Sequence, residues 1–553
     1  MIKVLQKFDL SNELLRDSND SFLAGRRFFV ILVLLLFYLK SISLIINPQF
    51  WAEDGPVFFS DAWSFGWSSI IRLQAGYFVA VLRIVALIST FLPIKLAPFI
   101  FGTFTLILTA CPVYLILSRR SDPILPGIAT KAVFALFYLV GPGSTEIYGN
   151  LTNLQWYLPV WFILFIFSTP SSSKVVRVLE YILLFLIALT GPFIIFLFPT
   201  YCALLVFKRI RLEYTIAAIL AVTFLAQGYA VFTTPQISGH LSISMLLKYI
   251  SSKIMLNGIL GIGGQRMIYK AAPDRFILIL GILVWFYTSA RIMITGSAFT
   301  KVILIFANLI FVAGCRKFAA LFTMDPDVGA RYSWFGIVAY LFVYYYIATR
   351  TTFRVEKWVF YTLFILGLIV GIPMDWGSYN LKTVNWKHEV RSFRWLNTGD
   401  TLMVNTDPVG WRFPIVKKQP SEIQKTEESA DIKSWVTLKI QNDRLMTTDA
   451  WAFIQNVSAT GNQLYVVLKS SDQFYVIPSE PQVRPDVSAF FKQDCDWSGF
   501  TISKSIAHVK EGKYSLGLFI FNTQTRQRSL KYLSHDIEIT HSGDLSAERV
   551  LNL

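Results

Sequence analysis

Two adjacent carboxylates, Glu53 and Asp54, stand in the otherwise apolar and aromatic stretch FWAEDGPVFF (residues 50–59). Repulsion between neighbouring like charges favours a carboxylate that is poised to abstract a proton. The stretch follows a hydrophobic run long enough to cross a membrane, and a carboxylate at a membrane boundary is a candidate functional group. The alternative is a solvated loop acid that caps the next helix, with Pro56 in its first turn.

A second stretch, EIYGNLTNLQWYLP (residues 146–159), gathers amides beside aromatic rings. Amides bind sugar hydroxyls through paired hydrogen bonds, and aromatic rings stack on the apolar faces of pyranoses. These residue types therefore predict sugar binding by Asn150, Asn153, Gln155 and Trp156. The alternative is a helix cap at Asn153 next to an aromatic belt at the membrane interface.

Several cations lie outside the loops that are expected to be cytoplasmic, so the bias of basic residues toward the cytoplasmic side does not explain them. A guanidinium grips phosphate oxygens bidentately, so such cations could hold the phosphate of a lipid carrier. The alternatives are snorkelling at the membrane surface and ordinary surface ion pairs. The candidates are Arg83, Arg316, Lys317 and Arg331, with Gln265, Arg266 and Lys270 weaker.

The composition predicts a polytopic α-helical membrane protein. The 553 residues are 54% hydrophobic and only 16% charged, whereas soluble domains are about 25% charged. The net charge of +16 resides largely in short loops between apolar runs, which indicates membrane topology and no nucleic-acid partner. The apolar runs predict about eleven spans, at 28–47, 96–117, 128–143, 154–168, 178–190, 192–207, 215–233, 275–295, 299–315, 333–348 and 357–375.

The distribution of basic loops predicts how these parts are arranged across the membrane. We expect residues 1–27 to be cytoplasmic and residues 28–376 to form the transmembrane domain, with an outer loop at 48–93 that carries the acidic pair. Residues 377–553 are polar and contain alternating runs such as QLYVVLK (463–469) and YSLGLFIF (514–521). These runs predict an antiparallel β domain on the outer face, built as a sandwich.

Other chemistries find no support in the sequence. It contains no P-loop, no dinucleotide-binding glycine pattern, no HExxH motif and no Cys/His spacing typical of a metal site. The four cysteines indicate no disulfide framework.

Several short motifs resemble bacterial C-type (GT-C) membrane glycosyltransferases, notably the O-antigen glucosyltransferases. They are WAEDG (51–55), AGYFVAVLR (75–83), GNLTNLQW (149–156), TGP (190–192), ARY (330–332), DPVGW (407–411) and RPDVSAFF (484–491). The resemblance implies an enzyme of the bacterial inner membrane, with its N-terminus cytoplasmic and its C-terminal domain periplasmic. It would transfer a sugar, expected to be glucose, from undecaprenyl phosphate to a surface polysaccharide such as the O-antigen of lipopolysaccharide.

The resemblance also implies roles for the candidate residues. Glu53 or Asp54 would be the general base in an inverting displacement that needs no cofactor, although a divalent metal at this pair stays open. A separate donor synthase and a flippase would supply the lipid-linked sugar. The phosphate would bind Arg331, Arg316, Lys317 and Arg83, and the sugar and acceptor would bind Tyr77, Asn150, Asn153, Gln155, Trp156 and Tyr332.

Three other functions compete with this one. A polysaccharide polymerase and a transporter of lipid-linked sugar would also act at the membrane, and a sugar-binding scaffold would work through the β domain alone. The polar residues gather on one expected face and no internal repeat is visible, which favours the enzyme over a transporter.

Overall fold

A computed structural model describes residues 20–552 of the chain with internal gaps. The gaps are 126, 145, 208–209, 235–241, 272–273, 318–330, 332–333, 335, 340–351, 377–383, 397–400, 409, 418–425, 427, 430, 442, 472, 507–508 and 541–550. The chain divides into two compact units, Met1–Val384 and Asn385–Leu553. The first unit is helical and the second is rich in β-strands.

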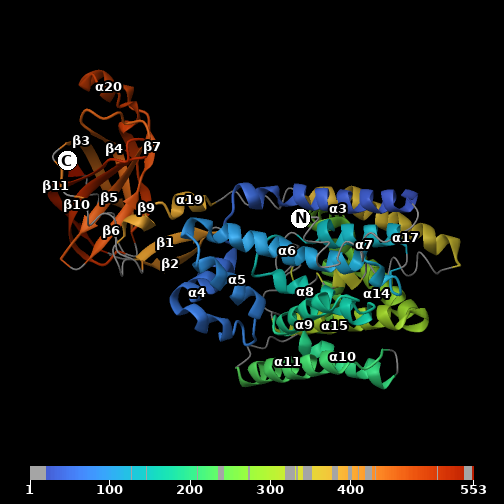
Figure 1. The fold of residues 1–553 in the computed structure, drawn as a ribbon. Coiled ribbons are helices and arrows are strands. Elements are labelled where there is room, and N and C mark those ends of the chain that lie inside the picture. The colour runs from blue at the N-terminus through green and yellow to red at the C-terminus, as the bar shows by residue number, and fades with distance from the viewer. Residues whose placement is uncertain are drawn as a thin grey trace. The chain divides into compact units, whose positions relative to one another are not determined.

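The long helices of the first unit lie roughly parallel to one another (Figure 1). Helix α3 packs against α6 and α7, α8 packs against α6 and α9, and α10 packs against α11 and α15. The helices are α3 (Asp20–Ile46), α4 (Ser60–Phe65), α5 (Ala80–Thr90), α6 (Ala97–Leu117), α7 (Ile128–Val140), α8 (Leu158–Phe167), α9 (Lys174–Ala188), α10 (Ile194–Val206), α11 (Tyr214–Thr233), α12 (Ile243–Tyr249), α13 (Asn257–Ala271), α14 (Asp274–Thr295), α15 (Ala298–Lys317), α17 (Arg354–Leu366) and α18 (Ile372–Trp376).

Short 3₁₀ and π-helical turns connect several of these helices. A 3₁₀ turn is wound more tightly than an α-helix and a π turn more loosely, and both occur mainly as short segments. The turns of the first unit are η1 (Ala52–Asp54), η2 (Gly55–Phe59), η3 (Gly66–Ile71), η4 (Ile94–Leu96), η5 (Arg119–Ser121), η6 (Leu154–Trp156), η7 (Ile250–Leu256) and η10 (Gly367–Gly371).

The prediction of about eleven membrane spans is wrong. In the described part of the chain, two helical stretches, Ile94–Leu117 and Tyr214–Thr233, are long and apolar enough to cross a membrane. The apolar stretches of the other described helices are shorter, at 10–17 residues each. Apolar stretches of 10–14 residues are more often core elements than spans. Helix α8 illustrates the reason for the error, because its apolar residues Leu158–Phe165 are all buried inside the unit. Apolarity there reflects core packing and not contact with lipid.

The two long apolar helices are compatible with membrane association. In the most apolar window of each, only 44% and 33% of the residues are buried. On α11, the Leu225 and Phe232 side chains are 68% and 83% exposed. Rows of large exposed apolar side chains are unusual on soluble monomers and indicate a membrane or a partner.

The second unit contains two packed β-sheets. One sheet has the strand order β11-β10-β5-β6, the other has the order β12-β3-β4-β8-β7 with β9 also paired to β4, and β1 and β2 form a separate hairpin. The strands are β1 (Thr401–Thr406), β2 (Trp411–Val416), β3 (Ile432–Gln441), β4 (Arg444–Ile454), β5 (Asn462–Lys469), β6 (Phe474–Pro478), β7 (Glu480–Gln482), β8 (Gly499–Thr501), β9 (Ser503–Ser505), β10 (Gly512–Asn522), β11 (Arg528–Ile539) and β12 (Leu551–Asn552). The helical elements are α19 (Trp386–Glu389), η12 (Phe393–Trp395), α20 (Pro485–Phe491) and η14 (Asp496–Ser498).

One continuous core fills the space between the sheets of this unit. Val436 on β3 belongs to the same buried cluster as Val466 on β5 and Leu518 on β10, and none of the three is exposed to solvent. In the alternating sequences of these strands, one set of side chains faces this core. The β-rich C-terminal part of the prediction is therefore present.

Candidate active site

The acidic loop leaves α3 and passes through η1, where the two carboxylates receive different environments. The Asp54 side chain is 2% exposed. One of its oxygens accepts hydrogen bonds from the backbone N–H and the hydroxyl of Thr152, both at 2.7 Å. The other accepts from the backbone N–H groups of Trp51 and Leu151, both at 3.3 Å. Asp54 thus connects the acidic loop to the amide-rich loop, about a hundred residues further along the chain.

Glu53 is the less engaged carboxylate. Its Oε2 is buried, yet it accepts no hydrogen bond from the residues that the structure describes. A buried carboxylate oxygen without a donor is costly in a structural role, and a reacting group or a bound hydroxyl would satisfy it. The preceding Ala52 has a positive φ of 42°, a conformation that residues other than glycine rarely adopt. The backbone is therefore strained next to Glu53.

Buried aromatic rings hold this loop in place. Phe50 and Phe59 flank the acidic pair and are fully buried, with ring centroids 5.2 Å apart. Phe101 from α6 lies against Phe50 at 4.8 Å. The aromatic residues around the acidic pair are thus core anchors that attach the loop to α6.

A tight turn brings Tyr77 to the same region. Gln74 and Tyr77 pair through two backbone hydrogen bonds, of 2.9 and 3.2 Å, and Ala75 and Gly76 between them both have positive φ. Two positive φ values characterise the two-residue turn that connects antiparallel strands. The sequence pair Ala-Gly in AGYF supports this turn, because glycine adopts positive φ without strain.

The Thr190-Gly191-Pro192 break between α9 and α10 docks on the segment that follows Tyr77. Gly191 N donates to Phe78 O at 2.9 Å, and Val81 N donates to the Thr190 hydroxyl at 3.1 Å. The fully buried amide of Gln227, from α11, bonds the N–H and C=O of Phe78 and the C=O of Gly191. One buried amide thus joins two loops that are far apart in the sequence.

Tyr77 lies near three other predicted site residues. Burial raises the pKa of the Tyr77 hydroxyl, the nearby charge of Arg331 and a hydrogen bond with Gln155 lower it, and the charge of Glu53 raises it. The structure therefore brings Glu53, Gln155 and Arg331 into electrostatic range of one tyrosine. A carboxylate, a cation, a phenol and an amide from four separate segments converge here.

Arg331 is positioned by Glu146. The carboxylate of Glu146 accepts from the Arg331 backbone N at 2.9 Å and lies 3.4 Å from its Nη1. The backbone carbonyl of Glu146 also accepts from the side-chain amides of Asn150 and Asn153, at 2.9 and 3.0 Å. These two asparagines shape their own loop, although Asn153 Oδ1 is buried and accepts no hydrogen bond from the described residues. Trp156 packs edge-on against Phe193, with centroids 5.3 Å apart.

Arg83 is engaged away from this cluster. It is 1% exposed, and its Nη1 lies 2.6 Å from Asp61 Oδ2, a carboxylate that also pairs with Arg72 at 3.4 Å. Its guanidinium lies 5.1 Å from the centre of the Phe58 ring. Arg83 thus neutralises Asp61 and links α5 to α4, so its charge is engaged within the protein and not with a lipid phosphate.

The remaining predicted binding residues are described only in part. Arg316 and Lys317 form the end of α15, but their side chains lie outside the described residues, as does Tyr332. Arg266 and Lys270 are exposed on α13, whereas Gln265 is fully buried.

Two residues of this region escaped the prediction. Glu146 stands in the amide-rich stretch 146–159, and Asp61 follows the acidic pair by about two helical turns. Each is the acidic partner of a predicted cation, so a search for a carboxylate to match each isolated arginine would have flagged both.

The acidic pair does not fit a metal site. Both oxygens of Asp54 already face N–H and O–H donors, whose positive ends would repel a cation. Among the described residues, no three His, Cys, Asp or Glu side chains are grouped closely enough to hold a metal ion.

Comparison of the chain with models of protein families, with curated proteins and with solved structures finds no match. The functional argument therefore rests on the arrangement of these side chains and on the short motifs of the sequence.

Proposed function

We propose that the chain is a membrane glycosyltransferase that moves a hexose, glucose in the first instance, from a polyprenyl phosphate to a hydroxyl of a surface polysaccharide. The convergence of Glu53, Tyr77, Gln155 and Arg331 supports this proposal, because the reaction needs a base, a cation and sugar-binding groups within one site. The motif resemblance to O-antigen glucosyltransferases supports the substrate class.

The observation that carries the proposal is the contrast between the two adjacent carboxylates. Asp54 accepts four hydrogen bonds within the protein, whereas Glu53 Oε2 accepts none from the described residues. A general base must keep an oxygen available for the proton that it abstracts. We therefore assign the base to Glu53 and give Asp54 a positioning role.

The proposed reaction is a direct displacement. The acceptor hydroxyl gives its proton to Glu53, and its oxygen forms a bond to the anomeric carbon of the donor sugar. The bond from that carbon to the phosphate oxygen breaks, and the electron pair stays on the phosphate. Arg331 stabilises this departing charge, and attack from the side opposite the phosphate inverts the anomeric centre.

The exposed apolar surface supports a location in a membrane. Besides α11, helix α17 presents Val355 and Trp358 with exposures of 76% and 73%. We place the protein in the bacterial inner membrane as a multi-pass protein, with the acidic loop and the β unit on the periplasmic side. A lipid-linked donor and a polysaccharide acceptor can meet at that face.

The test compares cells that carry the chain with cells that lack it. Mass and linkage analysis of their surface polysaccharide should show one added hexose per repeat when the chain is present. Glu53→Gln should abolish the addition while the protein remains in the membrane, and the matched change Glu538→Gln, at an exposed acid on β11, should leave it intact. Full addition by Glu53→Gln contradicts the assignment of the base, and an unchanged repeat with altered chain length indicates a polymerase.

A specific feature of the first unit favours transport as a second candidate function. Helix α13 is broken at Gly261, where φ is +70°. The buried Asp375 accepts from Ile262 N at 2.8 Å, just after this break, and from Gly143 N at 2.7 Å. Fully buried Asn257, on the same helix, makes no side-chain hydrogen bond with the described residues. Broken helices with buried polar groups are typical of transporter binding sites.

The two functions differ in the fate of the donor. Vesicles that contain the purified chain and a labelled polyprenyl-phosphate sugar would show movement of the lipid between leaflets if the chain is a transporter, without any acceptor. Transport should then depend on Asp375 and persist in Glu53→Gln. Sugar transfer that needs an acceptor and Glu53, with no movement between leaflets, rejects transport.

A further inference from the structure

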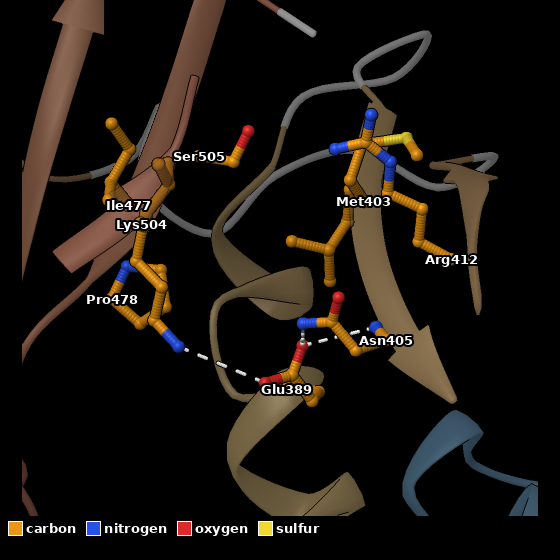
Figure 2. Close-up of a pocket in the computed structure, with 10 residues that line it drawn as sticks. Glu389, Met403, Asn405, Arg412, Ile477, Pro478, Lys504 and Ser505 are labelled. Atoms are coloured by element: carbon orange, nitrogen blue, oxygen red, sulfur yellow. Dashed lines mark hydrogen bonds and ion pairs between the residues drawn. The ribbon is translucent and has the colours of Figure 1, made fainter. Parts of the chain in front are cut away.

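The second unit contains a pocket between its hairpin and its sandwich. Figure 2 shows Met403, Asn405 and Arg412 of the β1-β2 hairpin on one side, Ile477, Pro478, Lys504 and Ser505 on the other, and Glu389 between them. The pocket has a volume of about 90 Å³. Typical sites for whole small molecules measure about 300–1,000 Å³, so this pocket suits one residue of a larger ligand.

A carboxylate and an amide form one end of the pocket. Glu389, at the end of α19, accepts hydrogen bonds from Asn405 Nδ2 at 3.0 Å and from its backbone N at 3.2 Å. Lys504 Nζ lies 3.8 Å from the other carboxylate oxygen (Figure 2). The fixed pair of Glu389 and Asn405 presents acceptors and donors together, which is the combination that binds neighbouring hydroxyls.

The charge of the lining is net positive. Arg412 and Lys504 contribute two cations against the single carboxylate of Glu389. Lys504 keeps 29% of its side chain exposed, and the pair with Glu389 at 3.8 Å is loose, so its ammonium can also meet a ligand. An anionic group on the ligand would gain from both cations, and a guanidinium matches a carboxylate bidentately.

The rest of the lining is apolar. Leu402 and Met403 come from β1, and Val476, Ile477 and Pro478 come from β6. These side chains offer a C–H surface without a hydrogen-bonding group of their own. A sugar ring has such an apolar face as well as its hydroxyls, so both parts of the lining have a counterpart in a sugar.

We propose that this pocket binds one acidic sugar residue, a uronic acid, within a longer glycan. Arg412 and Lys504 bind its carboxylate, Glu389 and Asn405 bind its hydroxyls, and the apolar side chains contact its ring. The proposal concerns the second unit alone and is independent of the sugar transfer assigned to the first.

The test uses the full-length chain in detergent micelles, with ligand-observed NMR titration of a trimer of galacturonic acid and of neutral maltotriose. The acidic trimer should bind more tightly than the neutral one. Arg412→Gln and Lys504→Gln should each weaken its binding by about tenfold or more, because each removes a charge-assisted contact. The matched change Lys433→Gln, at an exposed lysine outside the pocket, should leave the affinity unchanged.

Glu389→Gln is the most informative variant, because the direction of its effect on affinity depends on the charge of the ligand. The substituted glutamine keeps an acceptor oxygen for the sugar hydroxyls but carries no negative charge, so Glu389→Gln should strengthen binding of the acidic trimer. Weaker binding of the acidic trimer by a folded Glu389→Gln protein contradicts the proposal. Thermal unfolding of each variant shows whether the unit is still folded. Absence of binding by the folded protein, equal affinity for both trimers, or an equal loss in Lys433→Gln overturns the proposal.

Discussion

Replacement of Asp54 by Asn should separate the structural carboxylate of the acidic loop from the reactive one. In Asp54→Asn, the amide oxygen can replace the oxygen that faces Thr152, and the amide nitrogen must then occupy the other position. That position faces the backbone N–H groups of Trp51 and Leu151, both at 3.3 Å. These two donors, of which Leu151 N is buried and Trp51 N partly buried, lose their acceptor and meet a third donor instead.

The expected loss of stability follows from these contacts. A buried donor without a partner costs about 1–3 kcal/mol, so the two together cost about 2–6 kcal/mol. The neutral amide offsets part of this cost, because burial raises the pKa of Asp54 to about 7 and thus disfavours its charge. We expect a net destabilisation of about 2–4 kcal/mol for Asp54→Asn. In Glu53→Gln, where Oε2 accepts no bond from the described residues, the change should stay within about 0.5 kcal/mol.

Thermal unfolding of the purified chain, followed by tryptophan fluorescence, measures the change in stability, and an assay of sugar transfer measures the change in activity. Asp54→Asn should unfold several degrees below the unmodified chain and still transfer sugar at low temperature. Glu53→Gln should unfold like the unmodified chain, with transfer reduced about 10²–10⁴-fold. A stable but inactive Asp54→Asn protein, together with an active Glu53→Gln protein, would refute the reasoning and reverse the two roles.

Three further predictions test the roles assigned to these residues. Asp61→Asn leaves the buried guanidinium of Arg83 without its counter-charge and should destabilise the chain by about 3–5 kcal/mol. Arg72→Gln, at the half-exposed partner of Asp61, should cost less than about 1 kcal/mol. Equal melting temperatures of these two variants would contradict the prediction. Gly191→Ala should cost about 1–3 kcal/mol, because φ is +84° and the new Cβ would lie 2.7 Å from a ring atom; an unchanged melting temperature would show that the break adapts. Burial raises the pKa of Asp54 from 3.8 to about 7, so the folded chain binds this proton more tightly than the unfolded chain. The stability of the unmodified chain should therefore fall as pH rises from about 4 to about 7. Melting temperatures measured across this range should fall less steeply in Asp54→Asn, which lacks the titrating group.

The local sequence predicted the helices and strands well, but it did not predict whether lipid or protein surrounds them. The described apolar runs contain helices close to the expected positions, whereas the run expected at 333–348 lies largely outside the described residues. The alternating runs at 463–469 and 514–521 are strands of the β unit. Hydropathy does not distinguish a side chain that faces lipid from one that faces other helices. Helix α8 has the composition of a membrane span, but its apolar residues are buried in the unit, so the count of spans was wrong.

The sequence by itself determined which residue types were available for chemistry, namely an acidic pair, an amide-rich loop and isolated cations, because these stand out locally against an apolar background. Only the tertiary structure decided how they are used. Asp54 is bonded to Thr152 and Arg83 is paired with Asp61, while the charges of Glu53 and Arg331 shift the pKa of Tyr77 in opposite directions. These interactions join segments that are up to about 250 residues apart, and no local pattern encodes which distant donor will meet a given carboxylate.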